Sequence, residues 1–329
     1  MKALVTGAAG FIGSFLCRDL LAHGIEVTAF AMPGENIQPL KDRGIAVRVG
    51  DLTEAKSLKG CCDGMDIVFH LAARVTDWGP RQAFYEATYD TTQNLLEEAA
   101  GKVSRFVYVS SIAACGLGRH LKGRKESDPC FKSGVPYNDS KLDTEAFIRD
   151  VASKKDLMFT IIRPANVIGP GSVWVWDILD HLRTPMSVPL MDGGRYSASL
   201  VYVENLTDGI VKAGTADAAK GQIYQFRDDW NVTWKQYLTD LGAMIGKKPG
   251  LPVPFQLVWW GGTVMEAVLT PLGIRSPVTR LAASVLGRDN DVDNTKVKTE
   301  IGWQTFIPYD EAMARIRDWV TNVYMKSLK

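Results

Sequence analysis

A tyrosine and a lysine one helical turn apart, downstream of two serines, form the group of residues with the clearest chemistry. Tyr137 and Lys141 are separated by three residues, which places a phenol and an ammonium on one helix face. The apolar run 106–109 predicts a buried strand ending at Ser110 and Ser111, and open α/β sheets bind ligands at the carboxyl ends of strands. Tyr137 is then placed to exchange a proton with an alcohol or ketone, with Ser111 stabilising the substrate oxygen. We expect the charge of Lys141 to lower the pKa of Tyr137.

Three glycines near the start of the chain, Gly7, Gly10 and Gly13, have a Gly-x-x-Gly-x-x-Gly spacing. An apolar run at 2–5 before them predicts a strand, and the helical spacing at 11–23 predicts a helix that stops at a glycine. Gly7 permits a tight turn, Gly10 lets the backbone approach a phosphate, and Gly13 lets the helix pack closely. The pattern therefore predicts a binding site for the pyrophosphate of a dinucleotide at the helix N-terminus.

Strand-like runs alternate with helical patterns over the first half of the chain, which predicts a doubly wound parallel sheet. After residue 165 the composition shifts towards Trp, Pro and Gly and the alternation becomes irregular. We therefore expect a nucleotide-binding domain at 1–165 and a smaller substrate lobe, mainly 166–329. The strands expected after the first one are 26–31, 46–49, 67–70, 106–109 and 158–162.

The composition is that of a globular enzyme acting on a small molecule. The 329 residues carry a net charge of +1 and no basic run, so no nucleic-acid partner is expected. Five cysteines and four histidines lack metal-ligand spacing, so we predict no metal site and reduced thiols, as in a cytoplasmic protein. Met1 leads directly into the first strand, which leaves no room for a cleaved signal.

Taken together, these motifs resemble the extended short-chain dehydrogenase/reductases, the NAD-dependent epimerase/dehydratase family. The resemblance implies a Rossmann-type α/β fold whose smaller C-terminal lobe interleaves with it, a segment near 199–213 returning to the nucleotide domain. It also implies a homodimer formed through two helices of each subunit, one of them the Tyr137 helix. The residues that carry the resemblance are 6–13, 51–52, 70–73, 108–111, 137–141, 163–164, 169–170, 200–205 and 302–303.

The resemblance also implies roles for individual residues. Ser111 rather than Ser110 corresponds to the catalytic serine, because it lies five residues before Gly116. Tyr137 and Lys141 complete the catalytic set, and Lys141 also binds the nicotinamide ribose. The implied cofactor contacts are Gly7, Gly10, Phe11, Ile12, Gly13, Asp51, Leu52, Leu71, Ala72, Ala73, Tyr137, Lys141, Pro164 and Val167.

Two positions depart from the family pattern. Where NAD-using members carry an acidic residue at the end of the second strand, this chain has Ala31, followed by Met32. With no carboxylate to repel a 2′-phosphate, and with Lys41 or Arg43 near enough to bind it, we expect NADP(H) to bind at least as well as NAD(H). In addition, Thr88 stands where the family has Asn in a proton relay, which bears on the rate rather than on the reaction class.

The substrate class is predicted from positions at which two subgroups of the family carry different residues. Nucleotide-sugar enzymes place an Arg where this chain has 198–199, and a buried diphosphate needs such a cation. The segments 201–205 and 76–79, the latter with Trp78, resemble the 3β-hydroxysteroid dehydrogenase-like subgroup. Asn166 instead matches the nucleotide-sugar enzymes, and Arg195 could replace the cation that those enzymes need. We therefore expect Ser111, Trp78 and Asn166 to contact the substrate.

The predicted function is that of an NAD(P)-dependent oxidoreductase that interconverts a secondary alcohol and a ketone on a sterol-like or long-chain molecule. A nucleotide-sugar epimerase or dehydratase is the alternative. A non-catalytic dinucleotide-binding scaffold is the third hypothesis, which the intact set of Ser111, Tyr137 and Lys141 opposes. The sequence does not identify the individual substrate or the physiological direction of the reaction.

One apolar segment, 252–273, contains a single charged residue, Glu266. A transmembrane span is not expected, because 261–262 and Pro271 interrupt a run that barely reaches the required length of about 20 residues. We expect a core helix of the smaller lobe. The functional alternative is an apolar lid that covers a hydrophobic substrate and touches a membrane surface as an interfacial helix.

Overall fold

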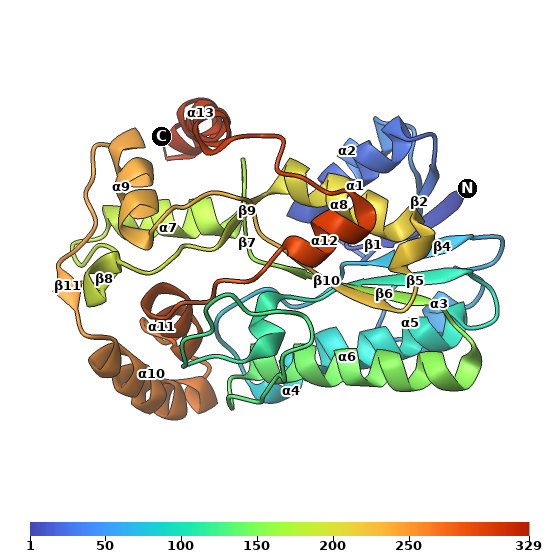
Figure 1. Cartoon of the computed structure of the whole chain (residues 1–329), viewed down its shortest axis with the longest axis horizontal. Coiled ribbons are helices and arrows are strands. Elements are labelled where there is room, and N and C mark those ends of the chain that lie inside the picture. The colour runs from blue at the N-terminus through green and yellow to red at the C-terminus, as the bar shows by residue number, and fades with distance from the viewer. Residues whose placement is uncertain (329) are drawn as a thin grey trace.

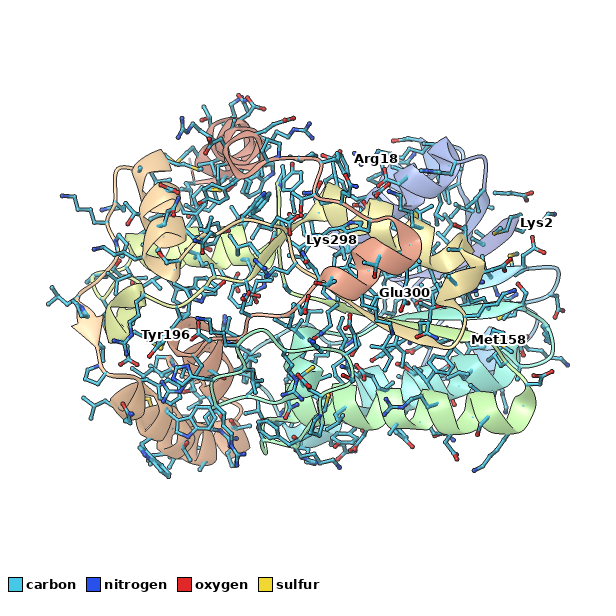
Figure 2. The ribbon with its side chains drawn as sticks, viewed as in Figure 1. Lys2, Arg18, Met158, Tyr196, Lys298 and Glu300 are labelled. Carbon is cyan, nitrogen blue, oxygen red and sulfur yellow. The ribbon has the colours of Figure 1, made fainter. Side chains whose placement is uncertain are left out.

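The computed structural model describes residues 1–328, and these contain a central sheet of seven parallel strands (Figure 1). The strand order is β10-β6-β5-β4-β1-β2-β3, so the chain winds outward in both directions from β1 and β4. This arrangement confirms the predicted doubly wound sheet, and its ligand crevice lies outside the carboxyl ends of β1 and β4. The strands are β1 (Lys2–Thr6), β2 (Glu26–Ala31), β3 (Ala46–Val49), β4 (Ile67–His70), β5 (Arg105–Val109), β6 (Phe159–Pro164) and β10 (Gln222–Phe226).

Helices cover both faces of this sheet (Figure 1). On one face, α1 (Phe11–Ala22) packs against α8 (Val203–Thr215), and α2 (Gln38–Lys41) lies near the edge strand β3. On the other face lie α3 (Ala55–Leu58), α5 (Thr91–Ala99) and the long α6 (Pro136–Lys155), with α4 (Arg81–Tyr85) beside the start of α6. The nearly continuous apolar sequence of the strands follows from this burial on both sides.

The smaller lobe lies at one end of the sheet, at the left of Figure 1, and consists mainly of helices. The chain passes from the sheet into this lobe and back again, because α8 and β10 follow β7 and α7 in the sequence but pack with the sheet. Two strand pairs, β8 with β11 and β7 with β9, link its segments. The elements are β7 (Asn166–Ile168), α7 (Val173–Arg183), β8 (Leu190–Met191), β9 (Leu200–Tyr202), α9 (Trp234–Met244), β11 (Pro252–Val253), α10 (Phe255–Leu269) and α11 (Arg280–Gly287). After them, α12 (Thr295–Ile301) packs on β10 of the sheet, and α13 (Tyr309–Trp319) and α14 (Met325–Ser327) follow.

Asn205, at the start of α8, joins segments that are far apart in the sequence. Its side chain donates to the Asp228 carboxylate at 2.9 Å and accepts from the Ile307 backbone N–H at 3.0 Å. Its backbone carbonyl accepts from the Trp303 indole N–H at 2.7 Å. All four residues are buried, and burial raises the pKa of Asp228 to about 7. The motifs at 200–205 and 302–303 therefore lock the C-terminal segment onto α8 rather than contact a ligand.

The expectation of a core helix at 252–273 is wrong. Within α10, Phe255 and Gly262 are buried, whereas most of the other side chains are half-buried or exposed. The inner side packs through Phe255 and Trp259, whose rings stack at 5.6 Å, and α11 lies against it. Figure 1 shows no element on the outer side, so the apolar outer residues stay in solvent. Among residues 1–328, no helix is long and apolar enough to cross a bilayer.

Candidate active site

The glycine turn between β1 and α1 has the close contacts that its spacing predicts. Gly7 has a φ of +66°, and a Cβ there would lie 2.9 Å from the backbone nitrogen of Ala72. A Cβ on Gly13 would lie 2.1 Å from the carbonyl oxygen of Gly7, so any side chain would force α1 off the turn. Gly10 donates its N–H to the Gly7 carbonyl at 3.0 Å and caps α1. The turn therefore rests directly on the carboxyl end of β4.

His70, the last residue of β4, fixes this contact through a buried chain of hydrogen bonds. The Thr92 hydroxyl donates to the carbonyl of Thr88, so His70 Nε2–H must donate to Thr92, at 3.0 Å. His70 Nδ1 then accepts from the Thr6 hydroxyl at 2.7 Å, and Thr6 accepts from Ala72 N–H. Burial lowers the pKa of His70 to about 3, so the ring is neutral and structural. Thr88 lies in a π-helical turn at Glu86–Asp90, and its carbonyl anchors this chain.

The two serines after β5 differ in what their hydroxyls bond. Ser110 Oγ donates to the buried carboxylate of Glu145 at 2.6 Å, so its proton is occupied. Ser111 caps the short 3₁₀ helix Ile112–Cys115, and its Oγ accepts the backbone N–H of Ala113 at 3.1 Å. That bond leaves the Ser111 proton available for a ligand. The geometry therefore favours Ser111 over Ser110, as the family resemblance also does.

Tyr137 and Lys141 occupy the first two turns of α6, beside Ser111. Lys141 Nζ donates to the carbonyl of Val109 at 3.0 Å and lies 4.8 Å from the centre of the Tyr108 ring. Burial lowers the pKa of Lys141 to about 7. Burial raises the pKa of Tyr137, and the Ser111 hydroxyl lowers it. Desolvation is therefore the larger influence, and the net pKa of this phenol is raised rather than lowered as expected.

A buried ion pair holds α6 against the sheet behind these groups. The Arg163 guanidinium, from β6, binds both carboxylate oxygens of Glu145, with its Nε at 3.0 and 3.2 Å. Both side chains are almost fully buried, and Ser110 adds a third donor to the carboxylate. The bidentate geometry fixes the rotation of α6 relative to β5 and β6. Because Glu145 is one turn beyond Lys141, the pair also fixes the position of the ammonium.

One cavity of about 1890 Å³ brings the predicted residues together. Every residue expected to contact the cofactor lines it, as do Ser111 and Asn166. Trp78 lines an adjoining cavity of about 340 Å³, which shares Asp77 and Tyr137 with the larger one. Ser111, Tyr137 and Lys141 thus share one cavity with the glycine turn and with residues of the smaller lobe such as Leu257.

Comparison with known proteins identifies this arrangement. The model of the NAD dependent epimerase/dehydratase family matches residues 3–226. The chain belongs to this family. The NAD-dependent epimerase/dehydratase family includes oxidoreductases and epimerases, and the cavity fits its dinucleotide: the glycine turn leaves space that a Cβ would fill, at the N-terminus of α1.

The relatives within the NAD-dependent epimerase/dehydratase family have different names. A 4-hydroxy-2-methyl-3-oxo-4-farnesyl-3,4-dihydroquinoline-1-oxide ketoreductase from Stigmatella aurantiaca is 28% identical over 323 residues, 96% of each chain. A 3-beta-hydroxysteroid dehydrogenase from Mycolicibacterium neoaurum is 25% identical over 340 residues, 98% of this chain and 92% of its own. The structure of UDP-glucose 4-epimerase from Thermotoga maritima covers 100% of both chains with a TM-score of 0.77 at 21% identity, which shows the fold.

Family-based reasoning missed an acidic residue near the end of β2. The sequence 32–35 forms a turn in which Glu35 N–H donates to the Met32 carbonyl, and Gly34 has a φ of +89°. The Glu35 carboxylate returns to accept the Met32 N–H at 2.9 Å, and both residues line the cavity. Pro33 and Gly34, at the centre of the turn, are the sequence signal that could have predicted it. A carboxylate thus reaches the strand end that Ala31 leaves without one, while Arg43 donates to the Ser14 carbonyl at 3.0 Å.

The substrate end of the cavity is predominantly apolar. Asn166 lies there with its amide nitrogen bonded to the Ala198 carbonyl at 2.7 Å. Arg195 does not line the cavity and bonds the Tyr196 hydroxyl, and Arg275 at the rim pairs with Asp77 at 3.0 Å. Two further arginines line the cavity: Arg124 donates to the backbone carbonyls of Asp128 and Pro129, and Arg74 lies over the Phe84 ring. The apolar wall includes Trp174, Ile178, Val188, Leu257, Val258, Met265, Leu281 and Leu286.

Proposed function

We propose that the protein interconverts a secondary alcohol and a ketone on a largely apolar molecule. The observation that carries this proposal is the shape of the cavity, which joins Ser111, Tyr137 and Lys141 to a wall of aliphatic and aromatic side chains. The names of two relatives, a ketoreductase and a hydroxysteroid dehydrogenase, support the same reaction class. The sterol-like or long-chain character of the substrate rests on the apolar wall.

The chain's own residues supply the proton chemistry of this reaction. A bound nicotinamide supplies or accepts the hydride. In ketone reduction, the Tyr137 hydroxyl donates its proton to the substrate oxygen, and the Ser111 hydroxyl donates a second hydrogen bond to it. The ammonium of Lys141 stabilises the resulting phenolate on Tyr137, in a buried site where the attraction is weakly screened. Alcohol oxidation uses the same groups in reverse.

A nucleotide-sugar epimerase or dehydratase is the alternative, and Asn166 on the cavity wall is the observation in its favour. The alternative needs cations for a diphosphate, and these would have to be Arg74 or Arg124, because Arg195 lies outside the cavity lining and Arg275 is paired with Asp77. A non-catalytic scaffold is disfavoured because Ser111, Tyr137 and Lys141 are all present and all line the same cavity. The proposed reaction and these two alternatives predict three different outcomes in a single assay.

The test is the absorbance of reduced nicotinamide when the purified protein meets steroid ketones, long-chain ketones and UDP-sugars. We expect net oxidation of the cofactor with at least one apolar ketone and none with UDP-sugars. A UDP-sugar whose configuration changes without net cofactor oxidation would contradict the proposal in favour of the epimerase. Tight cofactor binding without turnover of any of the three classes would favour the scaffold.

We also propose that Glu35 makes NAD(H) the preferred cofactor. The absence of a carboxylate at Ala31 favoured NADP(H), but the Glu35 carboxylate in the same strand-end turn repels a 2′-phosphate. We expect Glu35→Gln to lower the Kd of NADP(H) about tenfold, which is about 1.4 kcal/mol, and to change that of NAD(H) little. The measurement is a fluorescence titration with each reduced cofactor.

Glu26→Gln is the matched control for the cofactor prediction. Glu26 begins the strand that Glu35 follows, and its side chain is 68% exposed beside Lys2, far from the carboxyl end of β2. This variant should leave both dissociation constants unchanged. A wild-type protein that binds NADP(H) at least as tightly as NAD(H) would refute the proposed preference and restore the sequence-based expectation.

We propose a homodimer that pairs α6 across subunits, as in the family, and a cytoplasmic location. Ala146 is exposed and Leu142 half-buried on the outer side of α6, and Phe147 packs on Tyr89 at 5.2 Å. All five cysteines are free thiols, four of them buried, which supports a reducing compartment. The elution volume of the purified protein tests the dimer.

A further inference from the structure

The outer side of α10 carries a row of exposed apolar side chains, which we name the α10 stripe. It consists of Leu257, Trp260, Val264 and Val268, whose exposed fractions are 69%, 65%, 63% and 57%. Their spacing of three or four residues places them on one side of the helix. In an ordinary surface helix the solvent-facing side is polar and the apolar side faces the core. Helix α10 differs because its solvent-facing side is apolar.

The α10 stripe has no charge of its own. Glu266 is the one charged residue between 251 and 274. Its carboxylate turns inward, where it accepts from the Arg280 guanidinium at 2.7 Å and from the Arg280 backbone N–H, with 15% of the side chain exposed. The helix therefore directs its single carboxylate towards α11 and presents aliphatic and aromatic groups to the outside.

The substrate cavity opens beside this stripe. Leu257 belongs to the stripe and to the cavity wall, and Gly261 and Met265 on the same helix also line the cavity. Met186 and Leu251, which are 80% and 83% exposed, line the cavity from the segments next to β8 and β11. In Figure 1 these two strands lie beside α10 at the left end of the molecule. The apolar surface therefore extends from the outside of α10 to the cavity wall.

Two positive charges flank the apolar surface. Lys247 and Lys248 are both exposed. The Lys248 carbonyl accepts from the Ser187 hydroxyl at 2.9 Å, which ties the lysine segment to the loop of Met186. Lysines beside an apolar surface that bears a tryptophan match the interfacial region of an anionic bilayer.

A second copy of the chain is a poorer occupant for the same surface. Fifteen residues of helix span about 22 Å, and a stripe about 10 Å wide covers about 200 Å². A stable protein interface needs about 800 Å² from each partner. A bilayer has no such threshold, because each apolar side chain that enters the lipid contributes separately.

We propose that the α10 stripe docks on an anionic membrane surface, so that an apolar substrate passes between the bilayer and the cavity without crossing water. Trp260 and the valines enter the interface, and Lys247 and Lys248 face the lipid headgroups. The docking does not depend on the proposed reaction, because it uses residues outside the catalytic set. Membrane binding and hydride transfer can therefore fail independently.

Co-sedimentation of the full-length protein with vesicles tests the proposal. The vesicles are phosphatidylcholine alone or a mixture of phosphatidylcholine and phosphatidylglycerol. We expect binding to the mixed vesicles, weaker binding at high salt, and a loss of at least about tenfold in partitioning for the double variant Trp260→Ser, Val264→Ser. Neither residue lines the cavity, so cofactor binding should stay unchanged and report a folded protein.

The matched control replaces another exposed aromatic residue and another exposed valine, Phe306→Ser with Val323→Ser. These side chains are 56% and 46% exposed, and both lie outside α10. The control should bind vesicles as the wild type does. Equal loss in both double variants, or no binding of the wild type to mixed vesicles, would refute the proposal. Concentration-dependent dimers that disappear only in the α10 variant would refute it in favour of self-association.

Discussion

We expect Tyr137→Phe to lower the rate of ketone reduction by about 10²–10⁴-fold, because the variant removes the proton donor and keeps the ring. The ring packs edge-on against Phe84 at 6.5 Å, a contact that phenylalanine preserves. The glycine turn and the Asp51 loop are unchanged, so the Kd of NADH should stay within about twofold. Stopped-flow measurement of cofactor oxidation, together with a fluorescence titration, separates the two quantities.

Tyr85→Phe is the control for this prediction. Tyr85 lies on α4, one helix away, where its hydroxyl donates to Asp143 at 2.7 Å outside the cavity lining. Loss of this hydroxyl should change neither turnover nor cofactor affinity. If Tyr137→Phe keeps more than about a tenth of the wild-type rate, another group transfers the proton and the assignment of Tyr137 fails.

The strands of the nucleotide domain were predictable because each is a short apolar run with clear ends. The segments 26–31, 46–49 and 67–70 match β2, β3 and β4 residue for residue. Strand β10 was missed for a physical reason. It pairs only with β6 at the sheet edge, and Gln222 and Gln225 interrupt its sequence, so its apolar run is too short to stand out.

The candidate site was predictable where a motif fixes the backbone. Gly7 and Gly13 reveal their function by their spacing, because no other residue fits the contacts they make. Glu35 was missed because its side chain folds back over a turn, whereas the resemblance directs attention to Ala31. The outward side of α10 was equally hidden: when nearly all residues of a helix are apolar, their pattern does not show which side is buried.

Lys141 is expected to set the pH dependence of ketone reduction. Its pKa is lowered to about 7 by burial, so its ammonium is present below that pH and is lost above it. The pKa of Tyr137 is raised above its ordinary value of 10, so the phenol keeps its proton from about pH 5 to 9. The kcat/KM for the ketone should therefore be constant below about pH 7 and fall up to about tenfold per unit above it.

Lys141→Met removes this charge at every pH. We expect kcat/KM below pH 7 to fall about 10²–10³-fold, as when one preorganised electrostatic group is removed, and the decline above about pH 7 to disappear. The deficit relative to wild type then narrows as pH rises, because the wild type loses the same charge by deprotonation. Lys132→Met, which removes a half-exposed ammonium paired with Asp143, should keep the wild-type profile. A decline that persists in Lys141→Met would assign the titration to another group.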